Sequence, residues 1–352
     1  MSAVHPYFEL NDVDREFWAE RLDPFVPQEV FDAHRHIRLP EHIDPIPPSP
    51  AQAGPARFPD EIADGESLEE AALGNSQLLP GRSVSFLAFG SPRIQCHFEE
   101  NNAYLSEGLS GTASAALALA PPTWDAEKLL DQLRQPRIIG IKPYQSLIPG
   151  FDGEDVSVFD FCPHEHLELL DELGAWLTLH IARKERLADP ANVAEILEIR
   201  RRYPNLVLVI AHLGRSYAGG YARKGFPPLA EDDGILFDTS GVLNPAVFAL
   251  ALDRIGPERL MFGTDQPIFY MRGRRRWKGD QYINLTSGNY SWNVNREPPE
   301  VEATYTLSLY EAMAACTDTC RALGFDETTV QAIFHDNARR LVDRLLAEKE
   351  SW

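Results

Sequence analysis

Eight short apolar runs recur along the chain, and helix-like stretches separate each run from the next. The runs end at His36, Phe89, Ala120, Lys142, His180, His212, Asp238 and Asp265. Strands that alternate with helices pair in parallel, because each helix returns the chain to the same end of the sheet. The pattern predicts an α/β fold, a (β/α)8 TIM barrel formed by residues 1–352 as one domain. An open doubly wound sheet would favour a glycine-rich turn after the first strand, and none is present there.

Three segments stand outside this alternation. Residues 1–29 form an N-terminal helical segment, which we expect to close over the bottom of the barrel. Residues 38–65 contain seven prolines, which regular helices and strands do not tolerate, so they predict a loop or lid after the first strand. Residues 266–305 predict a second long loop, after the eighth strand. Both loops leave the end of the barrel where active sites lie, so both are expected to border the site.

Charge and composition exclude several classes of function. The formal net charge of −20 repels phosphate backbones and anionic lipids, so neither nucleic acid nor a membrane is an expected partner. The N-terminus has no basic region followed by an apolar one, and no apolar run is long enough to span a bilayer, so we expect a cytoplasmic protein. The chain has four cysteines without a CxxC pair, which we interpret as buried thiols.

Two histidines lie on one side of the first predicted strand. His34 and His36 are two residues apart, and strand geometry points both side chains the same way. Two adjacent imidazoles can bind one divalent metal, or they can be hydrogen-bonded residues of the barrel. His180, His212 and Asp265 also end apolar runs. In a closed barrel these ends converge on one face, so all five side chains should meet there.

The motifs that carry these residues resemble the amidohydrolase superfamily, specifically amidohydrolase family 2. The resemblance spans nearly the whole chain through DAHRHI, GIKPY, LTLHI, VIAHLG, GTDQP and FHDNARRLV. It implies a metal-dependent TIM barrel in which the metal is bound by His34, His36, His180 and Asp265. It places His212 at the edge of the site as an acid/base or substrate-orienting residue.

The chemistry of these residues agrees with that implication. Three neutral imidazoles and a carboxylate suit one Zn²⁺ with a position left for water, whose pKa falls to about 7. Asp265 can then act as general base, and His212 can polarise a carbonyl or hold the oxyanion. Asp238, which ends the seventh run, is expected to orient its neighbours.

Substrate contacts are less sharply indicated. Lys142 could be carbamylated to bridge a second metal, contact the substrate or pair with an acid, and the resemblance to single-metal sites favours the last two roles. Arg93, Arg183 and Arg215 follow strands two, five and six, where guanidinium groups could bind a substrate carboxylate. The basic and aromatic residues of 266–305 could line the mouth of the site for an anionic ligand, or dock on another subunit of a homo-oligomer.

Three functions remain open. The first is a metal-dependent hydrolase of a small carboxylated lactone, ester or amide. The second is a non-oxidative decarboxylase of an aromatic or unsaturated carboxylic acid, which the same family includes. The third is an inert barrel used for ligand sensing or assembly, which the complete set of histidines and aspartate disfavours.

Overall fold

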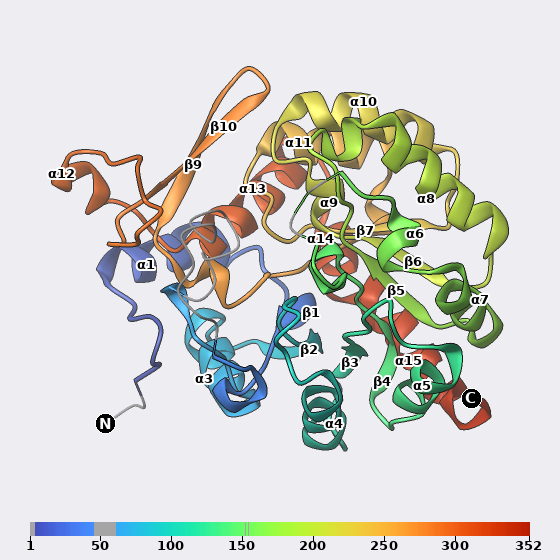
Figure 1. Ribbon diagram of the computed structural model, residues 1–352. Helices are drawn as coiled ribbons and strands as arrows, with labels where there is room; N and C mark the ends of the chain where they lie inside the picture. The colour runs from blue at the N-terminus through green and yellow to red at the C-terminus, as the bar shows by residue number, and fades with distance from the viewer. Residues whose placement is uncertain (1–3, 46–60, 152, 154) are drawn as a thin grey trace.

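Eight parallel strands form the centre of the molecule in a computed structural model that describes residues 4–45, 61–151, 153 and 155–352 (Figure 1). They follow one another round the sheet in chain order. The strands are β1 (Glu29–His36), β2 (Ser83–Phe89), β3 (Ala115–Ala118), β4 (Ile138–Ile141), β5 (Trp176–Leu179), β6 (Val207–Ile210), β7 (Ile235–Asp238) and β8 (Leu260–Met261). The predicted (β/α)8 barrel is confirmed.

Hydrogen bonds between the two ends of the sheet close the barrel. The amide of Ala33 donates to Phe262 at 2.8 Å, and the amide of Asp265 donates to His34 at 2.8 Å. Strand β8 ends at Met261, four residues before the predicted Asp265. The closure brings the end of the last strand directly against the paired histidines of the first.

One helix of at least eight residues follows each strand and covers the outside of the barrel. In chain order they are α3 (Leu68–Leu78), α4 (Phe98–Gly108), α5 (Ala126–Leu133), α7 (His164–Leu173), α8 (Pro190–Arg202), α10 (Gly219–Ala230), α11 (Pro245–Arg254) and α13 (Ser308–Ala322). The bounds of helix α10 were not predicted, because its three glycines and two prolines hide the helical pattern. Single turns α6 (Val158–Phe161) and α9 (His212–Arg215) precede α7 and α10.

The C-terminal helix closes the bottom of the barrel. Helix α15 (Asn337–Glu348) follows α14 (Glu327–Gln331) and a π-helical turn at Ala332–Asp336. Its Val342 and Leu345 are fully buried against the inward side chains of the strands, which include Phe31, Leu117 and Trp176. Burial of each aliphatic side chain contributes about 1.5–3 kcal/mol. The floor of the barrel is therefore made by α15.

The N-terminal segment is helical as predicted, but its predicted place was wrong. Helix α1 (Asp12–Phe17) and the π-helical turn Trp18–Leu22 pack on the outside against α13, where Trp18 and Phe17 contact Tyr310. Buried Asp14 accepts hydrogen bonds from Arg272 at 2.5 Å and from Thr306 at 2.9 Å. These bonds hold the segment to the chain after β8, away from the barrel floor.

The long loop after β8 contains a hairpin. Strands β9 (Gly273–Lys278) and β10 (Gln281–Thr286) pair antiparallel and extend from the barrel, and α12 (Pro299–Glu302) follows them (Figure 1). Of the predicted lid 38–65, residues 46–60 lie outside the described residues. The described part after β1 pairs with the loop after β2 through a bridge between Ile43 and Cys96. All four cysteines are buried free thiols, as predicted.

Candidate active site

The five predicted site residues gather at the C-terminal ends of the strands. The Nε2 atoms of His34 and His36 lie 3.5 Å and 3.4 Å from Oδ1 of Asp265. Ligand atoms of His34, His212 and Asp265 all lie within 4.8 Å of one another. The ring of His180 lies 5.3 Å from the ring of His212. Residues separated by most of the chain thus surround one small volume.

Three of the histidines have one nitrogen held by an oxygen acceptor. Nδ1 of His34 binds Asp238 at 2.8 Å, Nδ1 of His36 binds the carbonyl of Gly90 at 2.8 Å, and Nδ1 of His212 binds the carbonyl of Ser240 at 3.1 Å. Carbonyls and carboxylates only accept, so each Nδ1 carries the proton. Each Nε2 therefore carries a lone pair. Nε2 of His34 has no hydrogen-bond partner among the described residues, whereas Nε2 of His36 lies 3.5 Å from the hydroxyl of Tyr144. This is the arrangement that orients histidines as metal ligands.

Asp238 is the residue that aligns two of these histidines. Besides His34 Nδ1, its carboxylate accepts the backbone amide of His212 at 2.9 Å and the hydroxyl of Ser240. Burial alone would raise the pKa of Asp238, but His34 and its other donors hold that pKa well below the usual range. The prediction that Asp238 orients its neighbours is confirmed by these bonds.

The backbone is strained at two of the site residues. His212 and Asp265 have φ of +58° and +56°, in the left-handed region that non-glycine residues rarely adopt. The amide of His212 is held by Asp238 and the amide of Asp265 by His34. Such strain costs on the order of 1–3 kcal/mol and persists only where surrounding bonds impose it. Ligand atoms of both side chains lie within 4.8 Å of each other and of His34.

The electrostatics keep three of the site imidazoles neutral and the carboxylate of Asp265 ionised. Burial lowers the pKa of His34 to about 4 and the pKa of His212 below its ordinary value. Burial, with the charge of Arg215 beside it, holds the pKa of His180 well below its ordinary value. Burial would raise the pKa of Asp265, but His212, His36 and His34 outweigh it and lower that pKa to about 2. At neutral pH His34, His180 and His212 therefore offer neutral nitrogens, and Asp265 offers an anionic oxygen.

Lys142 lies in the same place without a hydrogen-bond partner among the described residues. It is fully buried, and Nζ lies 4.5 Å from the centroid of the Tyr144 ring and 5.4 Å from that of Phe89. Burial lowers its pKa to about 7, although Asp238 and Asp265 act in the opposite direction. Nδ1 of His180 is likewise buried with no partner in the described chain.

The three predicted arginines lie in different surroundings. Arg183 binds Glu195 through two nitrogens at 2.8 Å and 2.7 Å, so a protein carboxylate already occupies its guanidinium. This counts against a substrate contact at Arg183. Arg215 donates to the carbonyl of Ile181 at 3.3 Å and lies beside His180. Arg93 lies in the loop after β2, three residues past the carbonyl that binds His36.

Sequence reasoning did not single out Tyr217, Tyr144 or Arg275 individually, although all three lie at the candidate site. Tyr217 lies 6.2 Å from His212 between ring centroids, and Tyr144 lies 5.3 Å from His180. Arg275 of β9 reaches back to the carbonyl of Gly241 at 2.5 Å. The basic and aromatic run in 266–305 was the available signal for Arg275, and its inward position now supports a role at the mouth of the site. No comparable signal pointed to Tyr217.

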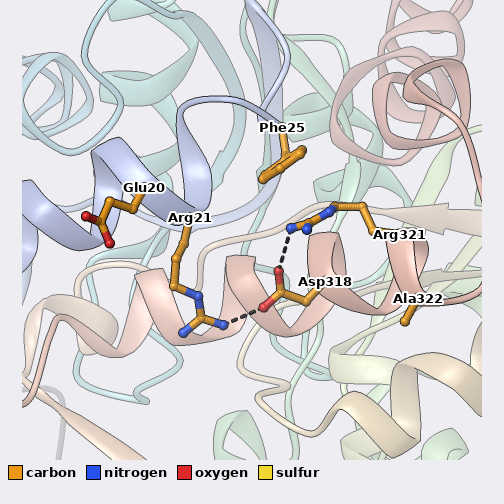
Figure 2. A pocket seen from close by; sticks show the side chains of 6 residues that line it. All are labelled: Glu20, Arg21, Phe25, Asp318, Arg321 and Ala322. Carbon is orange, nitrogen blue, oxygen red and sulfur yellow. Dashed lines mark hydrogen bonds and ion pairs between the residues drawn. The ribbon is translucent and has the colours of Figure 1, made fainter.

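A surface cleft of about 650 Å³ lies elsewhere, between the N-terminal segment and α13 (Figure 2). Three of its four charged side chains are paired with one another, because Asp318 binds both Arg21 and Arg321. Arg321 also lies over the ring of Phe25 at 3.9 Å. The cleft holds none of the five predicted site residues. We assign it no catalytic role.

Comparison with known proteins shows the family of this chain. The family model described as Amidohydrolase matches residues 31–344. This chain belongs to the amidohydrolase family. No curated protein matches it. None of the helices described, from residue 12 to residue 351, is long and apolar enough to cross a membrane.

Solved structures share the fold of this amidohydrolase at low sequence identity. An amidohydrolase from Burkholderia multivorans with bound zinc has 12% identity and a TM-score of 0.56, over 89% of this chain and 99% of that one. 2,6-Dihydroxybenzoate decarboxylase from Rhizobium has 15% identity and a TM-score of 0.54, over 90% and 99%. A protein assigned as 2-pyrone-4,6-dicarboxylic acid hydrolase from Pseudomonas putida has 18% identity and a TM-score of 0.51, over 90% and 98%. Hydrolases and a decarboxylase thus share this barrel.

Proposed function

We propose that this amidohydrolase is a metal-dependent hydrolase of a small carboxylated lactone, ester or amide. One observation carries the proposal. Nδ1 of His34, His36 and His212 each donates to an oxygen, while Nε2 of His34, beside the ionised Asp265, has no hydrogen-bond partner among the described residues. Histidines held only for barrel packing would satisfy both ring nitrogens, because a buried polar atom without a partner costs about 1–3 kcal/mol.

The donor atoms fit a divalent cation. Nε2 of His34 is buried and has no hydrogen-bond partner among the described residues, and neither does Nδ1 of His180. Imidazole nitrogens with a carboxylate oxygen are the donor set that zinc prefers. We propose His34, His36, His180 and Asp265 as the ligands of one zinc ion, with His212 adjacent. A bound metal of this kind would activate a water molecule and polarise a carbonyl.

The remaining roles follow from position and protonation state. Asp265 is ionised, so it can take a proton from the attacking water and pass it to the leaving group. His212 is next to it and can donate a hydrogen bond to the oxygen that gains charge, once protonated at Nε2, or orient the carbonyl. Lys142 provides a buried cation or neutral donor for a substrate oxygen.

Decarboxylation is the second candidate, because a decarboxylase shares the fold at a TM-score of 0.54. Loss of CO₂ needs a proton delivered to carbon, and His212 or Asp265 would have to supply it. Hydrolysis needs water within the site instead. The same residues can serve either reaction, so the substrate and product decide between them.

A panel of carboxylated lactones and aromatic acids tests both candidates. The purified protein is incubated with each compound, and acid release on ring opening is measured beside CO₂ release. We expect acid release without CO₂, with loss of the activity after metal removal and recovery on adding zinc. CO₂ release would assign the decarboxylase instead. Full ligand affinity and no turnover with or without metal would assign an inert barrel.

A further inference from the structure

Two arginines from different parts of the chain share one aromatic cluster beside His212. The guanidinium carbons of Arg186 and Arg275 lie 5.1 Å and 4.8 Å from the centroid of the Tyr217 ring. They lie 5.3 Å and 5.1 Å from that of Tyr282. The two cations are therefore neighbours, held between the same pair of tyrosines. Tyr217 contacts His212, so the cluster borders the candidate active site.

Neither arginine has a carboxylate partner within 4.0 Å in the described part of the chain. Arg275 uses Nε on Asn284 at 2.7 Å and Nη1 on the carbonyl of Gly241 at 2.5 Å. Arg186 donates from Nη2 to the Tyr282 hydroxyl at 3.2 Å, and its Nη1 is buried with no described partner. Several guanidinium N–H groups thus remain available, since each guanidinium carries five donors.

The arginines on either side of Arg275 in strand β9 form ion pairs with a carboxylate, in contrast to Arg275. Arg274 and Arg276 point to the other face of β9, because successive strand residues alternate. Both bind the carboxylate of Glu297, Arg274 at 2.8 Å. Of these three arginines, Arg275 is the one that faces the site, and it has no carboxylate partner among the described residues. Burial lowers the pKa of Arg275, and the charge of Arg186 acts in the same direction. An anion placed between the two would relieve this repulsion.

We propose that Arg186 and Arg275, framed by Tyr217 and Tyr282, form a binding subsite for a carboxylate of the substrate. Two guanidinium groups match a carboxylate through paired N–H bonds, and the tyrosine rings can flank the adjacent carbon skeleton. The subsite is joined to the catalytic residues through Gly241, which follows the Ser240 that binds His212. A substrate held here presents its reacting group to His212 and Asp265. The identity of the bound molecule as a substrate rests on the proposed function, but the binding itself does not require turnover or metal.

The test is calorimetric titration of the full chain, as purified and after metal removal, with isophthalate and with its neutral analogue isophthalamide. We expect isophthalate to bind more tightly than isophthalamide in both preparations. Arg275→Gln and Arg186→Gln should each weaken isophthalate binding about ten-fold, and Arg275→Lys about three-fold, because it keeps the charge and loses the planar fork. Arg276→Gln is the matched control on the same strand and should bind like the wild type.

Several results would overturn the subsite. These are equal affinity for isophthalate and isophthalamide, no binding of isophthalate at all, unchanged affinity in both glutamine variants, or tighter binding of inorganic phosphate than of isophthalate. Thermal melting shows whether each variant is folded. If Arg275→Gln does not fold, the isophthalate affinity of Arg186→Gln tests the subsite instead. If carboxylate binding depends on Arg275 but no metal-dependent reaction is found, the subsite proposal stands and the hydrolase proposal is rejected.

Discussion

At the bottom of the barrel, polar side chains in helix α15 and directly after it donate hydrogen bonds to backbone carbonyls. Asn337 donates to Pro257 at 2.9 Å and to Leu260 at 2.8 Å, and Lys349 donates to Leu133 and Ile138. At the mouth, His34 Nε2, His180 Nδ1 and Lys142 Nζ are buried without hydrogen-bond partners in the described chain. One barrel thus has hydrogen-bonded polar side chains at its bottom and buried polar atoms without hydrogen-bond partners at its mouth. Each buried polar atom without a hydrogen-bond partner lowers the stability of the fold by about 1–3 kcal/mol. Stability alone therefore does not explain why these residues are present at the mouth.

The largest expected effect is at the histidines of the mouth. His34→Ala, His36→Ala and His180→Ala should each lower the metal content far below one ion per chain and abolish activity, because each removes a proposed ligand. Elemental analysis of the purified variants measures the metal. His335→Ala, at the opposite end of the barrel beside Asp336, is the control and should keep wild-type metal. Wild-type metal in all three mouth variants would end the metal-site proposal.

Asp265→Asn should reduce kcat by about 10³-fold or more, because the amide cannot accept the proton of the attacking water. Its metal content should also fall, since Asp265 is a proposed ligand, and both quantities are measured on one preparation. Asp336→Asn at the bottom should leave kcat unchanged. A kcat within ten-fold of the wild type, with metal retained, would show that another residue is the base.

Asn337→Ala should act in the opposite way, on stability and not on chemistry. It leaves two carbonyls without their side-chain donor, so the free energy of unfolding should fall by about 1–3 kcal/mol. Urea unfolding measures this loss, while kcat per folded molecule should not change. Arg344→Ala, exposed on the same helix, should change the free energy of unfolding by less than about 0.5 kcal/mol. A lower kcat with unchanged stability would break the contrast between the two ends.

The smallest effect on metal is expected at Lys142. Burial lowers its pKa to about 7, so at pH 8 most of the side chain is the neutral amine that could capture CO₂. We nevertheless expect one metal per chain in the wild type, with or without bicarbonate at pH 8. Lys142→Ala should keep that ratio and raise KM about ten-fold by removing a substrate contact. A ratio near two that falls in this variant would instead show a bridging carbamate.

The barrel itself could be predicted from sequence because its signals are local. Apolar runs of strand length, the helices between them and the two-residue spacing of His34 and His36 depend only on neighbouring residues. The rule that parallel strand ends meet on one face then predicted that His180, His212 and Asp265 would join them. The structure brings these five together. The bounds of helix α10 escaped prediction because its glycines and prolines oppose the local pattern.

Other features were decided only by contacts between distant segments. No local pattern distinguishes α15 as the barrel floor from the N-terminal helices, because both are amphipathic and their place depends on what they pack against. The proton positions of His34, His36 and His212 follow from Asp238, Gly90 and Ser240, which tertiary closure supplies. Arg186 and Arg275 are 89 positions apart, and only the folded hairpin brings both against Tyr217. The amino-acid sequence by itself determined the barrel and the residues at its mouth, whereas the protonation, pairing and charge of those residues depend on three-dimensional neighbours.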